Sequence, residues 1–261
     1  MISSDGRLQN YPLALDAELI DAAREHGFRI DCGLAAGWHF WRSATSRGEI
    51  ALAAASLQGP FFLSVEHAGV ARELEADLAE PAAKGHAGAF AFPTRDALRV
   101  GVSSAYRLGV SLPTFPLEQF EAEVAELGST ETEAIVRRRI GQDRFRRALL
   151  DYHEGRCQLT GIDDPELLRA SHIIPWAACE SDDERLNVHN GLLLSSLWDA
   201  AFDCGLVSFA DDGTPLLAKQ LGDLARQSLD GSNLRLSRLT HDHRKRLSWH
   251  RQHLFEQALP R

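Results

Sequence analysis

The stretch that decides the fold runs from residue 167 to residue 203 and reads LLRASHIIPWAACESDDERLNVHNGLLLSSLWDAAFD. Its beginning, LLRASHII, and its later segment, GLLLS, are short apolar runs of the length typical of β-strands. A polar loop separates the two runs, and SLWDAAFD has the composition of a helix. The order strand, loop, strand, helix therefore predicts a β-hairpin that leads into a helix.

Side chains suited to the hydrolysis of a phosphodiester occupy this stretch. His172 ends the first predicted strand, while Asp199 and Asp203 lie four residues apart on the predicted helix. That spacing puts both carboxylates on one helix face, where they can share a cation. Oxygen ligands suit Mg²⁺ or Mn²⁺, and a histidine can accept a proton from water near neutral pH. The pattern predicts hydrolysis that uses one divalent metal ion.

Three blocks of this region resemble a known family. They are RCQLTG at 156–161, LLRASHIIPW at 167–176 and NVHNGLLLSSLWDAAFDCGLVSF at 187–209, and together they resemble the HNH endonuclease family, in particular its bacterial restriction-like branch. The resemblance is close over residues 141–218 and weaker towards the C-terminus. It implies an α+β protein whose C-terminal part is an HNH nuclease domain of the ββα-metal fold with flanking helices.

The resemblance also implies roles for particular residues. His172 takes the place of the general base, and Asn190 holds the loop that positions it. Asp199 and Asp203 take the places of metal ligands in an enzyme that cuts double-stranded DNA and leaves a 5′-phosphate and a 3′-hydroxyl. Ser171 departs from the family, because relatives often carry a metal-binding His or Asp there. A serine hydroxyl is a weak ligand, which keeps open a degenerate site in a protein that binds DNA without cutting it.

The cysteines do not predict a structural zinc site. The chain has four, which are scattered without paired spacing, and Thr160 stands where some relatives have the second cysteine of a pair begun by Cys157. Free thiols in a reducing cytoplasm are the simplest interpretation. No apolar run approaches the roughly 18 residues that would span a bilayer, and the first residues do not read as a secretory signal. We expect a cytoplasmic protein that does not enter membranes.

The charge of the chain is unevenly distributed. The net charge is −9 at pH 7, which argues against a surface that is basic throughout. Arginines nevertheless gather on a predicted helix capped by Thr130 and running to about His153, and residues 235–253 are basic as well. We expect DNA contacts from this second half; the alternative for the arginines is a solvated helix face. The expected contacts are Arg137, Arg138, Arg144, Arg147 and His189.

Two domains are expected, 1–128 and 129–261. The first should be a smaller mixed α/β domain of unknown type, with alternating apolar runs and turns. Its expected helices are 14–28, 69–78 and 117–127, and its expected strands lie within 37–65 and at 89–92 and 98–102. In the second domain, a hairpin is expected around residues 211–213 and a last helix over 241–258.

The role of the first domain stays open. It could recognise a DNA feature, a modified base being one candidate, or mediate assembly. Its aromatic residues could stack a flipped base, although strand core is the simpler interpretation: Trp38, Phe40, Trp41, Phe61 and Phe62. Cutting both strands would need two active sites, which makes a homodimer a candidate assembly. A restriction or defence nuclease is the leading expectation, and an antibacterial effector nuclease is a further alternative.

Overall fold

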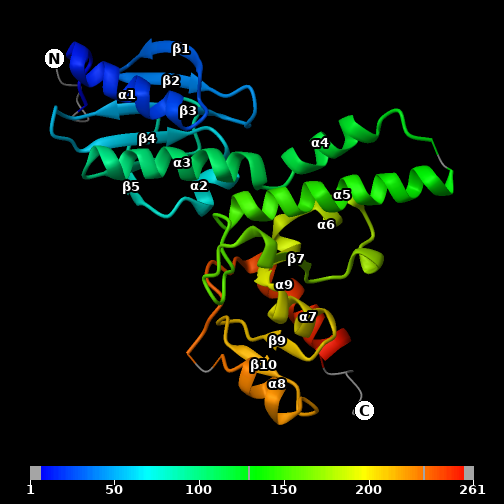
Figure 1. Ribbon diagram of the computed structural model, residues 1–261. Helices are drawn as coiled ribbons and strands as arrows, with labels where there is room; N and C mark the ends of the chain where they lie inside the picture. The colour runs from blue at the N-terminus through cyan, green and yellow to red at the C-terminus, as the bar shows by residue number, and fades with distance from the viewer. Residues whose placement is uncertain (1–6, 129, 232, 256–261) are drawn as a thin grey trace. The chain divides into compact units, whose positions relative to one another are not determined.

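The computed structural model describes residues 7–128, 130–231 and 233–255. It divides into two compact units, Met1–Phe115 and Pro116–Arg261, called here the N-terminal and the C-terminal unit. The division falls ahead of the boundary expected at residue 128, because Phe120 of helix α4 (Phe115–Val124) packs against Arg137 and Gly141 of the C-terminal unit. As predicted, the chain combines helices with antiparallel sheets (Figure 1).

The N-terminal unit is built on one antiparallel sheet with the strand order β1-β2-β3-β4-β6-β5. Helices α1 and α3 lie across one face of it (Figure 1). The strands are β1 (Ile30–Ala35), β2 (Trp38–Arg42), β3 (Glu49–Ala54), β4 (Phe61–Val65), β5 (Asp77–Ala79) and β6 (Gly88–Phe92). The helices are α1 (Leu13–Glu25), α2 (Ala68–Glu73) and α3 (Arg95–Ser111).

The alternation of side chains along the strands decides which face of this sheet each aromatic residue occupies. Trp41 and Phe61 are buried in the core, on the face that α1 and α3 cover. Trp38 is buried on the other face, where the Arg7 guanidinium lies 4.5 Å from its ring centroid. Phe40 and Phe62 pack beside Trp38 and stay half-buried.

One expected strand of this unit is wrong. Residues 98–102 belong to α3, which Thr94 begins by accepting the backbone N–H of Ala97 on its hydroxyl. Leu98, Val102 and Ala105 are all buried, and their spacing is that of one helix face. A strand-like apolar run was therefore the buried side of a helix. The helix expected over 69–78 ends earlier, at Glu73.

After α4, the C-terminal unit continues with the long helix α5 (Glu131–Tyr152), which the predicted Thr130 cap opens. The expected hairpin and helix follow as β7 (Leu168–His172), β8 (Gly191–Ser195) and α7 (Ser196–Asp203). The second predicted hairpin is also present. The remaining elements are η1 (Pro165–Leu167), η2 (Trp176–Ala178), α6 (Asp182–Leu186), η3 (Val188–Asn190), β9 (Val207–Phe209), β10 (Pro215–Leu217), α8 (Asp223–Ser228), α9 (His241–His250) and η4 (Arg251–Phe255). Of the last helix expected over 241–258, residues 256–258 lie outside the described residues.

The hairpin β7–β8 contacts α5 on one side and α7 on the other. His172 pairs with Gly191 across the hairpin. A Cβ atom at Gly191 would lie 2.6 Å from the Phe145 ring and 2.7 Å from Leu149, so the absence of a side chain lets α5 approach the strand closely. The register therefore holds the end of β7 directly against α5.

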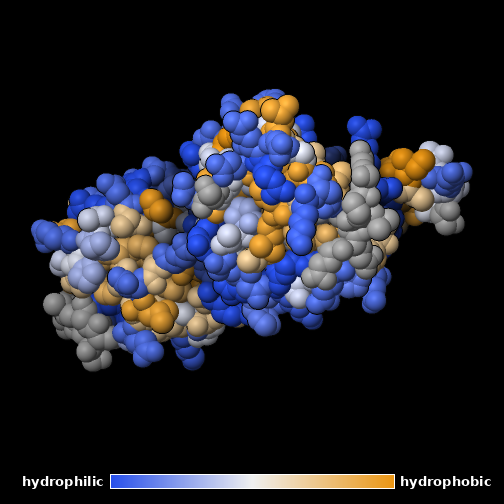
Figure 2. Space-filling model, turned by 90° about the horizontal axis from the view of Figure 1, so that it is seen from below, coloured by the Kyte–Doolittle hydropathy of each residue, from blue (hydrophilic) through white to orange (hydrophobic). Residues whose placement is uncertain are grey.

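Of the described part of the chain, no helix is both long enough and apolar enough to cross a bilayer. On the face shown in Figure 2, hydrophilic side chains surround several separate groups of hydrophobic ones. A buried hydrophobic core of the C-terminal unit includes Leu192, Phe202 and Phe209.

Candidate active site

The imidazole of His172 is held on three sides. Its ring stacks on Phe145 with the centroids 3.8 Å apart, and the Trp176 ring meets it edge-on at 5.6 Å. Its Nε2 lies 2.9 Å from the backbone oxygen of Arg185. A carbonyl oxygen only accepts, so Nε2 carries the hydrogen and Nδ1 carries the lone pair. The fold thus selects one tautomer and leaves Nδ1 as the basic atom.

The protonation state of this ring follows from its surroundings. Burial lowers the pKa of His172 to about 4, and the Arg185 carbonyl offsets only part of that effect. A neutral imidazole is the form that can take up a proton. His172 is therefore in the form of a base throughout the neutral pH range.

Asn190 ties the loop between β7 and β8 together. The side chain is fully buried. Its Oδ1 accepts the backbone N–H of Ile174 at 2.8 Å, and its Nδ2 donates to the carbonyls of Ile174 and Glu184, both at 3.2 Å. Glu184 directly precedes the Arg185 whose carbonyl anchors His172. Asn190 is thereby placed to position the histidine through the loop.

Two carboxylates and one hydroxyl gather on the α7 side of the hairpin. Ser171 donates a hydrogen bond of 2.6 Å to Oδ1 of Asp199. Partial desolvation first, and the charge of Asp199 second, raise the pKa of Asp203 to about 6, although the residue as a whole is exposed. Two like charges one helical turn apart repel each other, and a cation bound to both would relieve that repulsion.

The strand separates these two groups of residues. Consecutive side chains on a strand point to opposite faces, so Ser171 faces α7 and Asp199 while His172 faces α5 and Phe145. No hydrogen bond or ion pair between described residues joins His172 to Asp199 or Asp203. The two groups still adjoin, because Ser171 and His172 have Cα atoms only about 3.8 Å apart.

The donor set fits a hard cation better than zinc. Asp199 and Asp203 supply carboxylate oxygens, which Mg²⁺ and Mn²⁺ prefer. Within residues 7–128, 130–231 and 233–255, no three His, Cys, Asp or Glu side chains are placed to hold a metal ion. The protein's share of the ligands would thus be the two carboxylates, with water and substrate supplying the rest. Cys157 is a buried core residue whose sulfur accepts the backbone N–H of Ser195.

The arginines expected to contact DNA differ in whether they form ion pairs with acidic residues. Arg137 pairs with Asp182 at 2.8 Å, and Arg144 pairs with Glu123. Arg138 and Arg147 are exposed on α5. Those two exposed arginines have the free surface that a phosphate contact needs.

His189 lies in a buried histidine cluster that the sequence reasoning missed. Its exposed fraction is 7%, and its ring lies 5.1 Å from His243 and 5.9 Å from Tyr152, measured between centroids. Burial lowers the pKa of neighbouring His153 to about 3, and that of His243 well below its ordinary value. The scattered sequence positions gave no signal of this cluster, because α5, η3 and α9 meet only in the tertiary fold. A ring so enclosed offers DNA little surface.

Strand β7 thus ends in His172, and the helix that follows the hairpin carries Asp199 and Asp203 one turn apart. Residues 157–210 match the family model described as HNH endonuclease, so the C-terminal unit contains an HNH endonuclease domain. This domain indicates nuclease activity and implies DNA as the substrate, and HNH nucleases generally use a divalent metal ion. None of the curated proteins compared matches the chain.

Proposed function

We propose that this protein is a metal-dependent DNA endonuclease in which His172 is the general base and Asp199 and Asp203 hold one divalent cation. The observation that carries the proposal is the hydrogen bond between His172 Nε2 and the Arg185 carbonyl. It leaves a neutral Nδ1 as proton acceptor, one residue after the serine that contacts Asp199.

The reaction begins with a water molecule beside Nδ1 of His172. Nδ1 takes one proton as the water oxygen attacks phosphorus, and the bond from phosphorus to the 3′ oxygen breaks. The leaving oxygen gains a proton from solvent, which gives a 5′-phosphate and a 3′-hydroxyl. Bound at Asp199 and Asp203, Mg²⁺ or Mn²⁺ would stabilise negative charge on the phosphate and leaving oxygen.

Ser171 has a positioning role in this proposal. Its hydroxyl donates a hydrogen bond to Oδ1 of Asp199 and so holds the carboxylate in one orientation. The substitution of a metal-binding residue by serine at this position is then compatible with an active enzyme. Exposed Arg138 and Arg147 on α5 are the proposed phosphate contacts.

A second candidate function is DNA binding without cleavage. It is favoured by the finding that only two carboxylates, and no third protein ligand among the described residues, gather at α7. Plasmid cleavage separates the two functions. The purified protein should cut supercoiled plasmid with Mg²⁺ or Mn²⁺ and stop in excess chelator. His172→Ala should abolish cutting, while His26→Ala in the N-terminal unit should leave it unchanged; a wild type that binds DNA but never cuts would establish the second function.

The biological setting we propose is restriction or defence, with DNA recognition by the N-terminal unit and modified bases among its targets. Half-buried Phe40 and Phe62 are the aromatic residues of the sheet with remaining accessible surface. Digestion of unmodified, methylated and hydroxymethylated DNA tests the target. Equal cutting of all three would rule out modification dependence, and light scattering would show whether the protein is a homodimer.

A further inference from the structure

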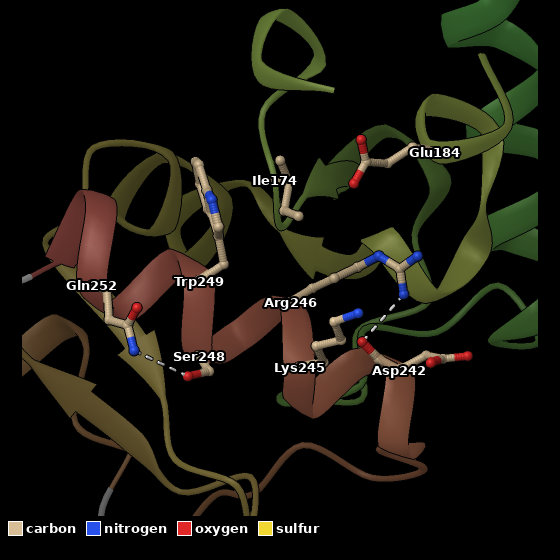
Figure 3. A pocket seen from close by; sticks show the side chains of 8 residues that line it. All are labelled: Ile174, Glu184, Asp242, Lys245, Arg246, Ser248, Trp249 and Gln252. Carbon is tan, nitrogen blue, oxygen red and sulfur yellow. Dashed lines mark hydrogen bonds between the residues drawn. The ribbon is translucent and has the colours of Figure 1, made fainter. Parts of the chain in front are cut away.

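A pocket of about 290 Å³ lies between the β7–β8 loop and α9. Figure 3 shows Ile174 and Glu184 on one side of it, with Lys245, Arg246 and Trp249 extending from α9 on the other. The volume falls just below the usual range of small-molecule pockets, about 300–1,000 Å³. It suits a group the size of one nucleobase.

The loop side of the pocket is built from the contacts that position His172. Asn190 binds the backbone of both Ile174 and Glu184. The carbonyl of Arg185, the next residue, anchors the imidazole. A ligand in this pocket would therefore lie beside the loop that carries the proposed catalytic base.

The helix side of the pocket supplies positive charge. Lys245 is exposed, and Arg246 donates to the backbone oxygen of Asp242 at 3.2 Å. The buried Nε of Arg246 has no hydrogen-bond partner among the described residues. A phosphate oxygen in the pocket would provide an acceptor for the Lys245 ammonium and the terminal guanidinium nitrogens of Arg246.

The acidic residues of the pocket make contacts other than ion pairs with Lys245 or Arg246. Glu184 accepts the backbone N–H of Glu180 on Oε2 at 2.9 Å. Oδ2 of Asp242 lies 3.8 Å from Nδ1 of His189, and Figure 3 shows the Asp242 side chain directed away from Trp249 and Ile174. Neither acid cancels the cations of α9 in a simple pair.

Trp249 provides a flat apolar surface of fixed orientation. Its ring is half-buried and stacks on His253, with 4.4 Å between centroids and 11° between planes. In Figure 3 the indole extends from α9 towards the wall that contains Ile174. A held aromatic ring beside two cations is the combination on which proteins stack a base and bind its phosphate.

We propose that this pocket binds one nucleotide of the DNA next to the bond that is cut. Trp249 stacks on its base, and Lys245 and Arg246 contact its phosphate. The proposal rests on the proposed endonuclease function and adds a substrate-binding site to it.

Binding of a fluorescent DNA duplex, measured by anisotropy without divalent metal, tests the site. Loss of one base–aromatic stack is worth about 1–3 kcal/mol, so Trp249→Leu should weaken binding about 5- to 150-fold, and Trp249→Phe should keep most of the affinity. Lys245→Ala should weaken binding and reduce the salt slope by about 1. Lys219→Ala removes the same charge from an exposed position of the same unit, and it should change neither the DNA affinity nor the salt slope.

The outcomes distinguish this proposal from the endonuclease function. If wild type cuts DNA and His172→Ala does not, but folded Trp249→Leu binds like wild type, the pocket is not a DNA site. If wild type neither binds nor cuts, both proposals fall. Circular dichroism checks the fold of each variant. If Trp249→Leu does not fold, the two lysine variants decide: equal DNA affinities of Lys245→Ala and Lys219→Ala would overturn the proposal.

Discussion

The hydroxyl of Ser171 donates a 2.6 Å hydrogen bond to Oδ1 of Asp199, across the gap between strand β7 and helix α7. A residue that cannot serve as a strong metal ligand is thus bound to one that can. This contact links the strand that ends in His172 to the helix that bears both carboxylates.

Removal of the Ser171 hydroxyl should weaken metal binding rather than abolish it. Ser171→Ala leaves Asp199 free to rotate, and loss of an outer-shell partner costs about 10- to 100-fold in metal affinity or activity. Ser171→Thr keeps the hydroxyl and should restore most of the affinity. Calorimetric titration with Mn²⁺ measures the effect; identical affinities for wild type and Ser171→Ala would refute the positioning role.

The tautomer of His172 should be visible in solution. Because the Arg185 carbonyl accepts from Nε2, and because burial lowers the pKa to about 4, the ring should stay neutral with hydrogen on Nε2 down to about pH 5. Nitrogen chemical shifts of the imidazole report both the tautomer and the charge. A ring protonated near pH 6, or one with hydrogen on Nδ1, would contradict the structure.

Asn190→Ala should destabilise the C-terminal unit. The variant removes three hydrogen bonds to the backbone of Ile174 and Glu184, each worth about 1 kcal/mol, so we expect a loss of about 3 kcal/mol. Urea unfolding measures the free energy. Asn187→Ala, which removes one side-chain hydrogen bond to the backbone of His189, is the comparison and should cost about 1 kcal/mol; equal losses would show that Asn190 does not hold the loop.

The buried histidine cluster should make stability fall in mild acid. His153 has a folded-state pKa of about 3, below the value of about 6.5 in the unfolded chain, so the unfolded state binds more protons between those values. Stability is complete above about pH 6.5 and declines below it by about 1.4 kcal/mol per pH unit for this residue. Urea unfolding of wild type and His153→Gln at a series of pH values tests this, with the exposed His241→Gln as control. If His153→Gln leaves the slope of wild type unchanged, His153 does not titrate as the structure indicates.

The sequence predicted the local elements around the site well. Thr130 and Glu133 form the cap that opens α5, and the apolar runs at residues 168–172 and 191–195 form the paired strands. The four-residue spacing of Asp199 and Asp203 places both on α7. Each of these features depends on residues close together in the chain, which a pattern can capture.

The misread segment at residues 98–102 shows where such patterns fail. A short apolar run fits a strand and a helix face equally, and burial of Leu98 and Val102 on α3 decided between them. The pocket at α9 was signalled only as a basic stretch. Its second wall, at Ile174 and Glu184, is distant in sequence.

The amino-acid sequence by itself determined which groups are present: the hairpin, the helix that follows it, an imidazole at one strand end and two carboxylates one turn apart. Only the tertiary structure decided how they are used. The contacts of His172 with the Arg185 carbonyl and with Phe145 select its tautomer and charge. The hydrogen bond to Asp199 gives Ser171 a positioning role. The reason is physical: secondary structure follows from neighbouring residues, whereas pKa, tautomer and hydrogen-bond partner depend on burial and on groups that only folding brings together.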